Sequence, residues 1–148
     1  MSLENTINEA IKTAMREKNK VALDSLRAVK SQILLLKTEA KGAEVSAEQE
    51  IAILQRMIKQ RKDSFEQFAA QGRNDLAEVE DAQMKVIEKF LPKQLSPEEL
   101  ETEIKTIITQ TGAETIKDLG KVMGVASKTL AGKSDGKSIS EMVKKLLS

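Results

Sequence analysis

The chain has 148 residues, 40% hydrophobic and 32% charged, a balance typical of a folded domain with a hydrated surface. It contains no His, Cys, Trp or Tyr, which excludes disulfides, thiolate chemistry and the usual nitrogen and sulfur ligands of zinc. The net charge of +1 argues against indiscriminate binding to nucleic acid, so any RNA contact must come from local clustering of charge.

These absences also bound the chemistry and the location. Without His, no side chain has an ordinary pKa near neutral pH, so we expect no catalytic residue, no cofactor and no metal site. No segment approaches the roughly 18 consecutive apolar residues of a membrane span. We therefore expect a cytoplasmic protein without a membrane partner.

Helical periodicity recurs from end to end, while the alternation typical of strands is missing. Four predicted helices cover residues 3–18, 20–41, 46–72 and about 74–91. Met15 lies on the apolar face predicted for the first helix, and we expect the fourth helix to bury Val79. A capping box at Ser46 and Gln49 opens the third, and Pro92 closes the fourth. The sequence predicts an all-α fold that begins with a four-helix N-terminal domain, residues 1–92.

A second, smaller domain follows at residues 93–148, with three shorter helices. Ser96-Pro97-Glu98-Glu99 combines an N-cap, an N1 proline and a capping box, and Gly112 ends the helix that they open. Thr115 with Asp118 opens the next helix, which runs to Leu130, and Asp135 or Ser138 opens the last. Heptad-like apolar stripes also fit a coiled-coil dimer, but packing within one chain explains them more simply.

The predicted helix over residues 116–130 carries a row of lysines on the side opposite its apolar residues. The row consists of Lys117, Lys121 and Lys128, with Gly120 and Gly124 beside it. An interior glycine costs a helix about 1 kcal/mol relative to alanine. Two glycines on an outward face therefore indicate that another backbone or a phosphate approaches closely there.

Two further lysines, Lys133 and Lys137, follow in the next loop. The segment from Thr115 to Lys145 contains seven lysines and three acidic residues, so its net charge is +4 in a nearly neutral protein. Lysines at such spacing suit phosphate contacts that position a folded RNA without reading its sequence. The alternative is an ordinary solvated helix face with glycines that break or cap helices, and spacing alone favours this alternative.

Other motifs give weaker indications of a functional site. The Gly-Lys-Ser triplets at residues 132–134 and 136–138 suggest a phosphate-binding P-loop, but the glycine required five residues earlier is missing and no strand precedes them. A basic run is interpreted as solvated surface; it consists of Arg56, Lys59, Arg61 and Lys62. An acidic cluster is interpreted in the same way; it consists of Glu78, Glu80 and Asp81.

Several separate segments resemble the YqeY-like family, in the family's order and across nearly the whole chain. They are Lys59–Ser64, Gly72–Glu78, Phe90–Ser96, Gly120–Gly124 and Gly132–Lys137. One departure is Phe90, where the family pattern leads us to expect tyrosine before Leu-Pro. This family shares its domain with the C-terminal tail of the B subunit of the glutamine-dependent tRNA amidotransferase, which amidates glutamate or aspartate already charged onto tRNA.

The resemblance implies a helical N-terminal domain, a three-helix C-terminal domain and a tail that contacts tRNA. In the amidotransferase the chemistry lies in a separate catalytic cradle, and this chain resembles only the tail portion. We therefore expect carbon–nitrogen ligase activity, with glutamine as amido donor, only within a larger complex.

With the resemblance, RNA contact becomes the favoured interpretation of the lysines. The expected contacts are Lys117, Lys121, Lys128, Lys133 and Lys137, with Gly120 and Gly124 permitting close approach. Two alternatives remain open. In the first, the chain is a component that acts on charged tRNA together with amidotransferase subunits. In the second, it is a helical adaptor between proteins and has no RNA role.

Overall fold

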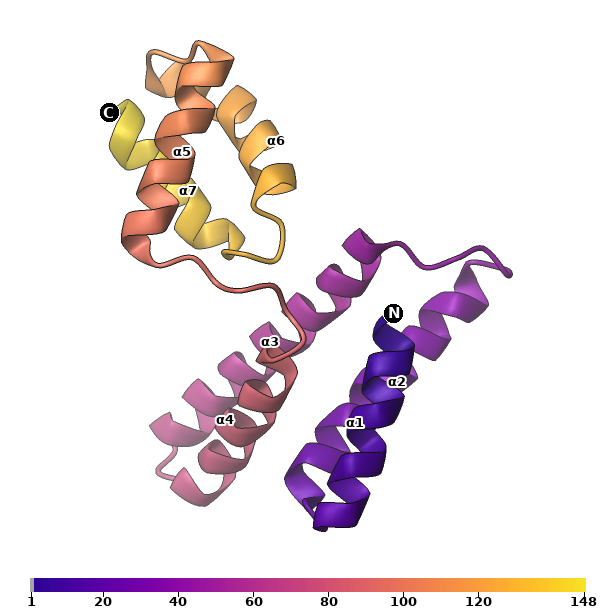
Figure 1. Ribbon diagram of the computed structural model, residues 1–148. Helices are drawn as coiled ribbons and strands as arrows, with labels where there is room; N and C mark the ends of the chain where they lie inside the picture. The colour runs from indigo at the N-terminus through magenta and orange to yellow at the C-terminus, as the bar shows by residue number, and fades with distance from the viewer. Residues whose placement is uncertain (1) are drawn as a thin grey trace. The chain divides into compact units, whose positions relative to one another are not determined.

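The structure, a computed structural model, describes residues 2–148 and contains within them seven α-helices, one 3₁₀ turn and no strand (Figure 1). The elements are α1 (Leu3–Glu17), α2 (Lys20–Glu39), α3 (Ala47–Ala70), α4 (Asn74–Glu88), α5 (Pro97–Thr111), the 3₁₀ turn η1 (Ile116–Asp118), α6 (Leu119–Thr129) and α7 (Gly136–Leu147). The predicted all-α fold is confirmed. The chain divides into two compact units, the first ending at Leu91 and the second beginning at Pro92.

Capping side chains fix where helices begin and end. The Ser96 hydroxyl accepts from the Glu99 amide at 3.1 Å, and the Glu99 carboxylate accepts from the Ser96 amide at 3.1 Å. Ser46 and Gln49 form the same reciprocal pair at the start of α3. At the other end of α5, Gly112 adopts the left-handed conformation, with φ +70°, that disfavours side chains. The predicted capping boxes are confirmed.

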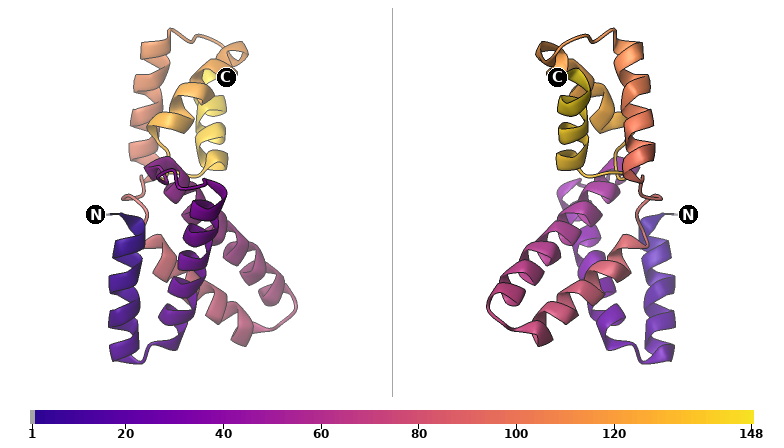
Figure 2. Two further views of the ribbon diagram at one scale, coloured as in Figure 1. Left: turned by 90° about the vertical axis from the view of Figure 1, so that its right-hand side faces the viewer. Right: turned by 90° about the vertical axis from the view of Figure 1, so that its left-hand side faces the viewer.

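In the first unit, α1 packs on α2, α3 packs on α4, and α2 also packs on α4. Figure 2 shows α3 and α4 as an antiparallel pair joined by a short turn. The core that they enclose consists of Ile7, Ala14, Ala22, Leu26, Val29, Ile33, Ile53, Leu54, Met57 and Ile87. Phe90 and Leu91, just before the boundary, pack partly buried against this core.

Two residues predicted to lie on apolar helix faces of the first unit are exposed. Val79 is 44% exposed, so the prediction that it is buried was wrong, and Met15, placed on the apolar face of α1, is 56% exposed. The neighbouring buried positions are Ala14 in α1 and Ala77 in α4. Because each residue advances about 100° around a helix, a side chain one or two positions later points away from the core.

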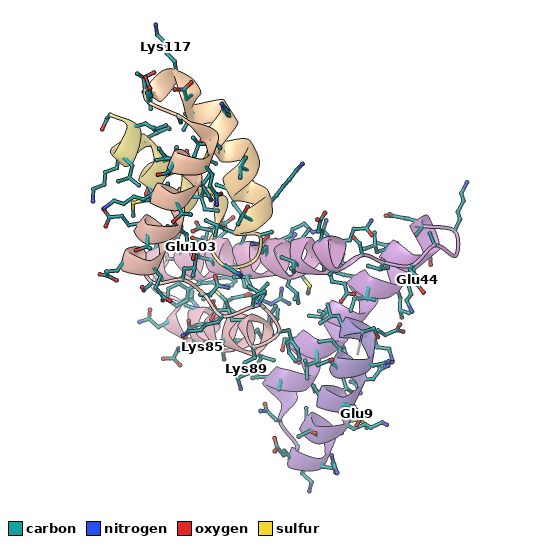
Figure 3. The ribbon with its side chains drawn as sticks, turned by 45° about the horizontal axis from the view of Figure 1, so that its top comes forward. Glu9, Glu44, Lys85, Lys89, Glu103 and Lys117 are labelled. Atoms are coloured by element: carbon teal, nitrogen blue, oxygen red, sulfur yellow. The ribbon has the colours of Figure 1, made fainter. Side chains whose placement is uncertain are left out.

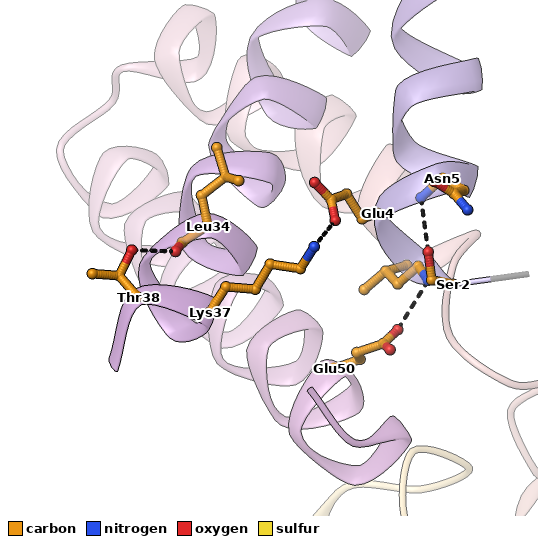
Figure 4. A network of polar contacts seen from close by, with 8 residues as sticks. Ser2, Glu4, Asn5, Leu34, Lys37, Thr38 and Glu50 are labelled. Carbon is orange, nitrogen blue, oxygen red and sulfur yellow. Dashed lines mark hydrogen bonds and ion pairs between the residues drawn. The ribbon is translucent and has the colours of Figure 1, made fainter. Parts of the chain in front are cut away.

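Polar contacts join the start of α1 to α2 and α3 (Figure 4). The Leu3 amide donates to a Glu50 carboxylate oxygen at 3.1 Å, and Lys37 forms an ion pair with Glu4. The Ser2 hydroxyl caps α1 by accepting from the Asn5 amide at 3.2 Å. These contacts hold the first turn of α1 against the other two helices.

The second unit packs α5, α6 and α7 against one another. Its core consists of Leu100, Ile104, Ile107, Val122, Ala126, Leu130, Ile139, Val143 and Leu147. Each helix contributes one apolar face, which leaves its other face to solvent. No helix within residues 2–148 combines the length and the apolar character needed to cross a membrane.

Candidate nucleic-acid interface

The segment predicted as one helix over residues 116–130 consists of two elements. It begins with the 3₁₀ turn Ile116–Asp118, and the α-helix starts only at Leu119. Lys117 therefore lies in the turn, so the prediction of three lysines in one row on a single α-helix was wrong. Only Lys121 and Lys128 lie on α6, while Lys117 lies in the turn before it and projects outward in Figure 3.

The side chain of Asp118 closes this 3₁₀ turn. Its Oδ2 atom accepts from the backbone amides of Glu114 at 2.9 Å and Thr115 at 3.2 Å, and the Thr115 hydroxyl accepts from the Lys117 amide at 3.3 Å. The two backbone hydrogen bonds lower the pKa of Asp118, and the charge of Lys121 adds to the shift. The predicted pairing of Thr115 with Asp118 is confirmed, and it fixes the backbone conformation of the turn that contains Lys117.

Helix α6 buries most of its apolar residues on the side away from its lysines, while Val125, 38% exposed, lies on the lysine side. Val122 and Ala126 are buried, while Lys121 and Lys128 are exposed on the opposite side. The two lysines are seven residues apart, which places their Cα atoms roughly 10 Å apart along the helix axis. The predicted apolar face is confirmed, and α6 presents two cations side by side to solvent.

Packing within the chain requires neither Gly120 nor Gly124 to be glycine. Both are exposed, and a Cβ atom built at either position meets no atom within 4 Å. Neither residue has a positive φ, so alanine fits the backbone at both positions. The two glycines weaken the helix without any benefit to the packing of the unit.

The loop after α6 is held by contacts that the sequence pattern did not reveal. The Leu95 amide donates to the Lys133 carbonyl at 2.9 Å, and the Gln94 side-chain amide donates to the carbonyl oxygens of Gly132 and Pro92. Gly132 is buried with φ +77°, a conformation that glycine adopts without strain. Gln94 is thus a supporting residue of the loop that carries Lys133, and no local motif marks it.

The last expected lysine, Lys137, lies in the first turn of α7, which begins at Gly136. We call the set Lys117, Lys121, Lys128, Lys133 and Lys137 the lysine surface; all five are exposed. Six ion pairs form within residues 2–148, and none of them includes a member of this set. Their ammonium groups are therefore available to an anionic partner.

The basic run of α3 differs from the lysine surface because three of its four members, all but Lys62, have partners within the chain. Arg56 donates to the Gln32 side chain at 3.0 Å, and Lys59 pairs with Asp63 at 3.2 Å. Arg61 is half-buried and donates to the Met57 carbonyl at 3.2 Å and to the Gln83 side chain at 3.3 Å. Burial lowers the pKa of Arg61, and the charge of Glu80 opposes this shift.

The acidic cluster of α4 does not assemble a site. Asp81 pairs with Lys85 at 2.8 Å, an i,i+4 contact along the helix surface. Within residues 2–148, no three acidic side chains converge as metal ligands would. The site that the side chains of the second unit build best is a surface of ammonium groups suited to phosphate oxygens.

Comparison with known proteins identifies the family. The Yqey-like protein family model matches residues 4–147. The protein named "Altered inheritance of mitochondria protein 41, mitochondrial" from Pyrenophora tritici-repentis is 30% identical over 141 residues, which cover 93% of this chain and 76% of the relative. Its namesake from Meyerozyma guilliermondii is 38% identical over 92 residues, which cover 59% of this chain and 45% of the relative.

A third relative of the same name, from Clavispora lusitaniae, is 31% identical over 90 residues, covering 61% of this chain and 52% of that protein. The match thus spans about half the length of two of these relatives. All three are named as mitochondrial proteins, and the cytoplasmic location expected for this chain stays a prediction. Because the family model covers nearly the entire chain, this protein belongs to the YqeY-like family.

Proposed function

We propose that this chain is a tRNA-binding module that contacts RNA phosphates through the lysine surface. The observation that carries the proposal is the placement of five exposed lysines, none of them in an ion pair, on η1, α6, the loop that follows and the first turn of α7. The other two lysines of the segment from Thr115 to Lys145 are Lys144 and Lys145, and the local excess is +4 against +1 for the whole chain. This concentration supports binding through one region rather than through net charge.

The physical basis is the release of counterions from the RNA. Each ammonium group that neutralises a phosphate frees a condensed cation, so affinity falls as the salt concentration rises. Lysine contacts a phosphate as a point charge on a flexible stem, which positions the partner without reading its bases. The proposed module therefore recognises a folded RNA by its charge and shape.

Within this proposal, residues 1–92 and 93–148 are separate domains, and the first is the scaffold or the docking surface for another protein. The chain has no active site of its own. Carbon–nitrogen ligase activity with glutamine as amido donor would appear only when amidotransferase subunits are added to it. Failure of those subunits to co-purify with the chain, or to form amide when mixed with it, would count against a role in amidation.

The test is binding of the full chain to total tRNA at two salt concentrations. A double variant, Lys121→Gln with Lys128→Gln, is compared with a matched control, Lys59→Gln with Lys105→Gln. Both control lysines are exposed and ion-paired, Lys59 with Asp63 and Lys105 with Glu101, and surface pairs of this kind contribute about 0–1 kcal/mol. Both variants remove two positive charges, so a difference between them reports the location of the charge.

The proposal predicts that the α6 variant binds tRNA about tenfold more weakly at low salt, while the control binds nearly as well as the unchanged chain. Equal affinity of the two double variants would mean that binding follows net charge alone. Absence of tRNA binding by the unchanged chain near physiological salt would overturn the proposal.

One observation favours a second candidate, a helical adaptor. A groove of 480 Å³ lies between the C-terminal half of α2 and the N-terminal half of α3, with Leu35, Leu36 and Ala52 in its lining. Leu35 is 53% exposed, so a protein partner seated in this groove would cover its side chain. An adaptor predicts that Leu35→Lys releases a protein partner without changing tRNA affinity, which pull-down and tRNA titration of the same variant would check.

A further inference from the structure

The outer surface of α6 has two distinct strips. Lys121 and Lys128 form one strip of long side chains, separated by about two helical turns. Gly124 and Gly120 lie about 60° and 100° around the helix from Lys121, where the backbone has no side chain to cover it. Ser127, also exposed, continues this second strip with a small hydroxyl side chain. The lysines therefore extend beyond a bare stretch of helix that another molecule can approach closely.

The basic side chains of the second unit are all of one residue type. All nine basic residues within residues 92–148 are lysines, and the three phenylalanines of the chain, Phe65, Phe68 and Phe90, belong to the first unit. Stacking on unpaired bases uses aromatic rings or the planar guanidinium of arginine, and bidentate contact with guanine is typical of arginine. Flexible lysines with bare backbone beside them suit the sugar–phosphate backbone instead.

A-form RNA offers such a backbone in its minor groove. This groove is wide and shallow, and it displays ribose 2′-hydroxyls between two lines of phosphates. A helix without side chains along one strip can lie against the riboses, while lysines beside that strip reach the phosphates at the groove edge. The hydroxyl of Ser127 can both donate to and accept from a 2′-hydroxyl.

We propose that α6 binds double-stranded RNA across the minor groove, through its glycine strip and its two lysines, without regard to base sequence. This inference rests on the proposed function and narrows it to a class of RNA. The 2′-hydroxyls and the shallow groove distinguish an RNA duplex from a DNA duplex of the same charge. The site thus selects RNA over DNA by shape and selects duplex over single strand by groove geometry.

The experiment is competition against labelled tRNA bound to the full chain. The competitors are an RNA duplex of roughly 16 base pairs, a duplex of shuffled sequence, a DNA duplex of the same sequence and one RNA strand alone. The expected result is that both RNA duplexes compete equally, and about tenfold better than the DNA duplex or the single strand.

A variant separates the glycine strip from the charges. Gly124→Leu adds bulk to the strip and replaces glycine with a better helix former, so α6 is retained. Its control is Thr129→Leu, which places the same leucine side chain on the other side of the lysines, about 80° from Lys121. We expect Gly124→Leu to abolish the preference for RNA over DNA while the salt dependence of binding stays, and Thr129→Leu to keep both.

The outcomes distinguish the two proposals. If tRNA binds but single-stranded RNA or duplex DNA competes as well as duplex RNA, this inference is overturned while the lysine surface stands. An unchanged RNA preference in Gly124→Leu also overturns it. If neither tRNA nor any competitor binds, the proposed function fails, and this inference fails with it.

Discussion

The backbone amide of Leu95 donates a hydrogen bond to the carbonyl oxygen of Lys133 over 2.9 Å. This contact joins the segment that precedes α5 to the loop between α6 and α7, two parts of the second unit that are distant in sequence. The neighbouring Gln94 side chain strengthens the junction by donating to the Gly132 carbonyl. The position of one lysine of the surface therefore depends on residues outside the lysine-rich segment.

Gln94→Ala should loosen this junction. Removing the side-chain donor leaves the carbonyl of the buried Gly132 without this partner, at a cost of about 1 kcal/mol in the free energy of unfolding. Urea denaturation monitored by circular dichroism measures the change. Gln110→Ala, at an exposed position near the end of α5, is the control and should shift stability by less than about 0.5 kcal/mol. Equal effects of the two substitutions would show that the Gln94 contact contributes nothing.

Gly120→Ala and Gly124→Ala should each stabilise the protein by about 0.5–1 kcal/mol, because alanine favours helix and its Cβ meets no atom at either position. Gly112→Ala should instead destabilise it, since that residue has φ +70°. Thermal unfolding of the three variants tests this contrast. Destabilisation by Ala at position 120 or 124 would reveal a packing role for glycine within the chain.

Arg61→Ala should lower the free energy of unfolding by about 1–2 kcal/mol, because the half-buried guanidinium links the Met57 carbonyl in α3 to the Gln83 side chain in α4. The exposed neighbour Lys62 provides the control, and Lys62→Ala should change stability by less than about 0.5 kcal/mol. Both variants are measured by urea denaturation. A similarly small effect at both positions would place Arg61 among the solvated surface residues.

The lowered pKa of Asp118 predicts that the stability of the fold depends on pH in the acidic range. Its pKa is lower in the folded chain than in the unfolded one, where an aspartate has a pKa of about 3.9. The stabilising contribution is therefore complete above that unfolded value and is lost as the pH falls through the depressed folded pKa. Urea midpoints of the unchanged chain and Asp118→Asn should differ most at neutral pH and converge as the pH falls through the depressed pKa of Asp118. A constant gap across this range would contradict the assignment.

Local signals predicted much of the second unit. Ser96 with Glu99, and Thr115 with Asp118, mark helix starts because a side chain there must replace missing intrahelical partners for backbone amides. The same signals do not separate a 3₁₀ turn from an α-helix, since both begin with the same capping residues. The placement of Lys117 was therefore mispredicted by one element.

Local sequence patterns could not predict contacts between distant segments. The hydrogen bond from Gln94 to Gly132 depends on how the helices of the unit pack, and a glutamine in a polar linker carries no motif for it. The exposure of Val79 likewise follows from which side of α4 faces its neighbours, and Ala77 takes the buried position. Periodicity gives a helix a wide apolar stripe, and packing decides which edge of the stripe is covered.

The measurement that tests the central claim most directly is the salt dependence of tRNA binding by the full chain and by a variant with all five lysines of the lysine surface changed to glutamine. Each phosphate contact contributes about 0.7–0.9 to the slope of log affinity against log salt, so the variant without all five lysines should lose about 3.5 to 4.5 units of slope. Equal slopes for the two proteins would show that these lysines do not contact RNA phosphates.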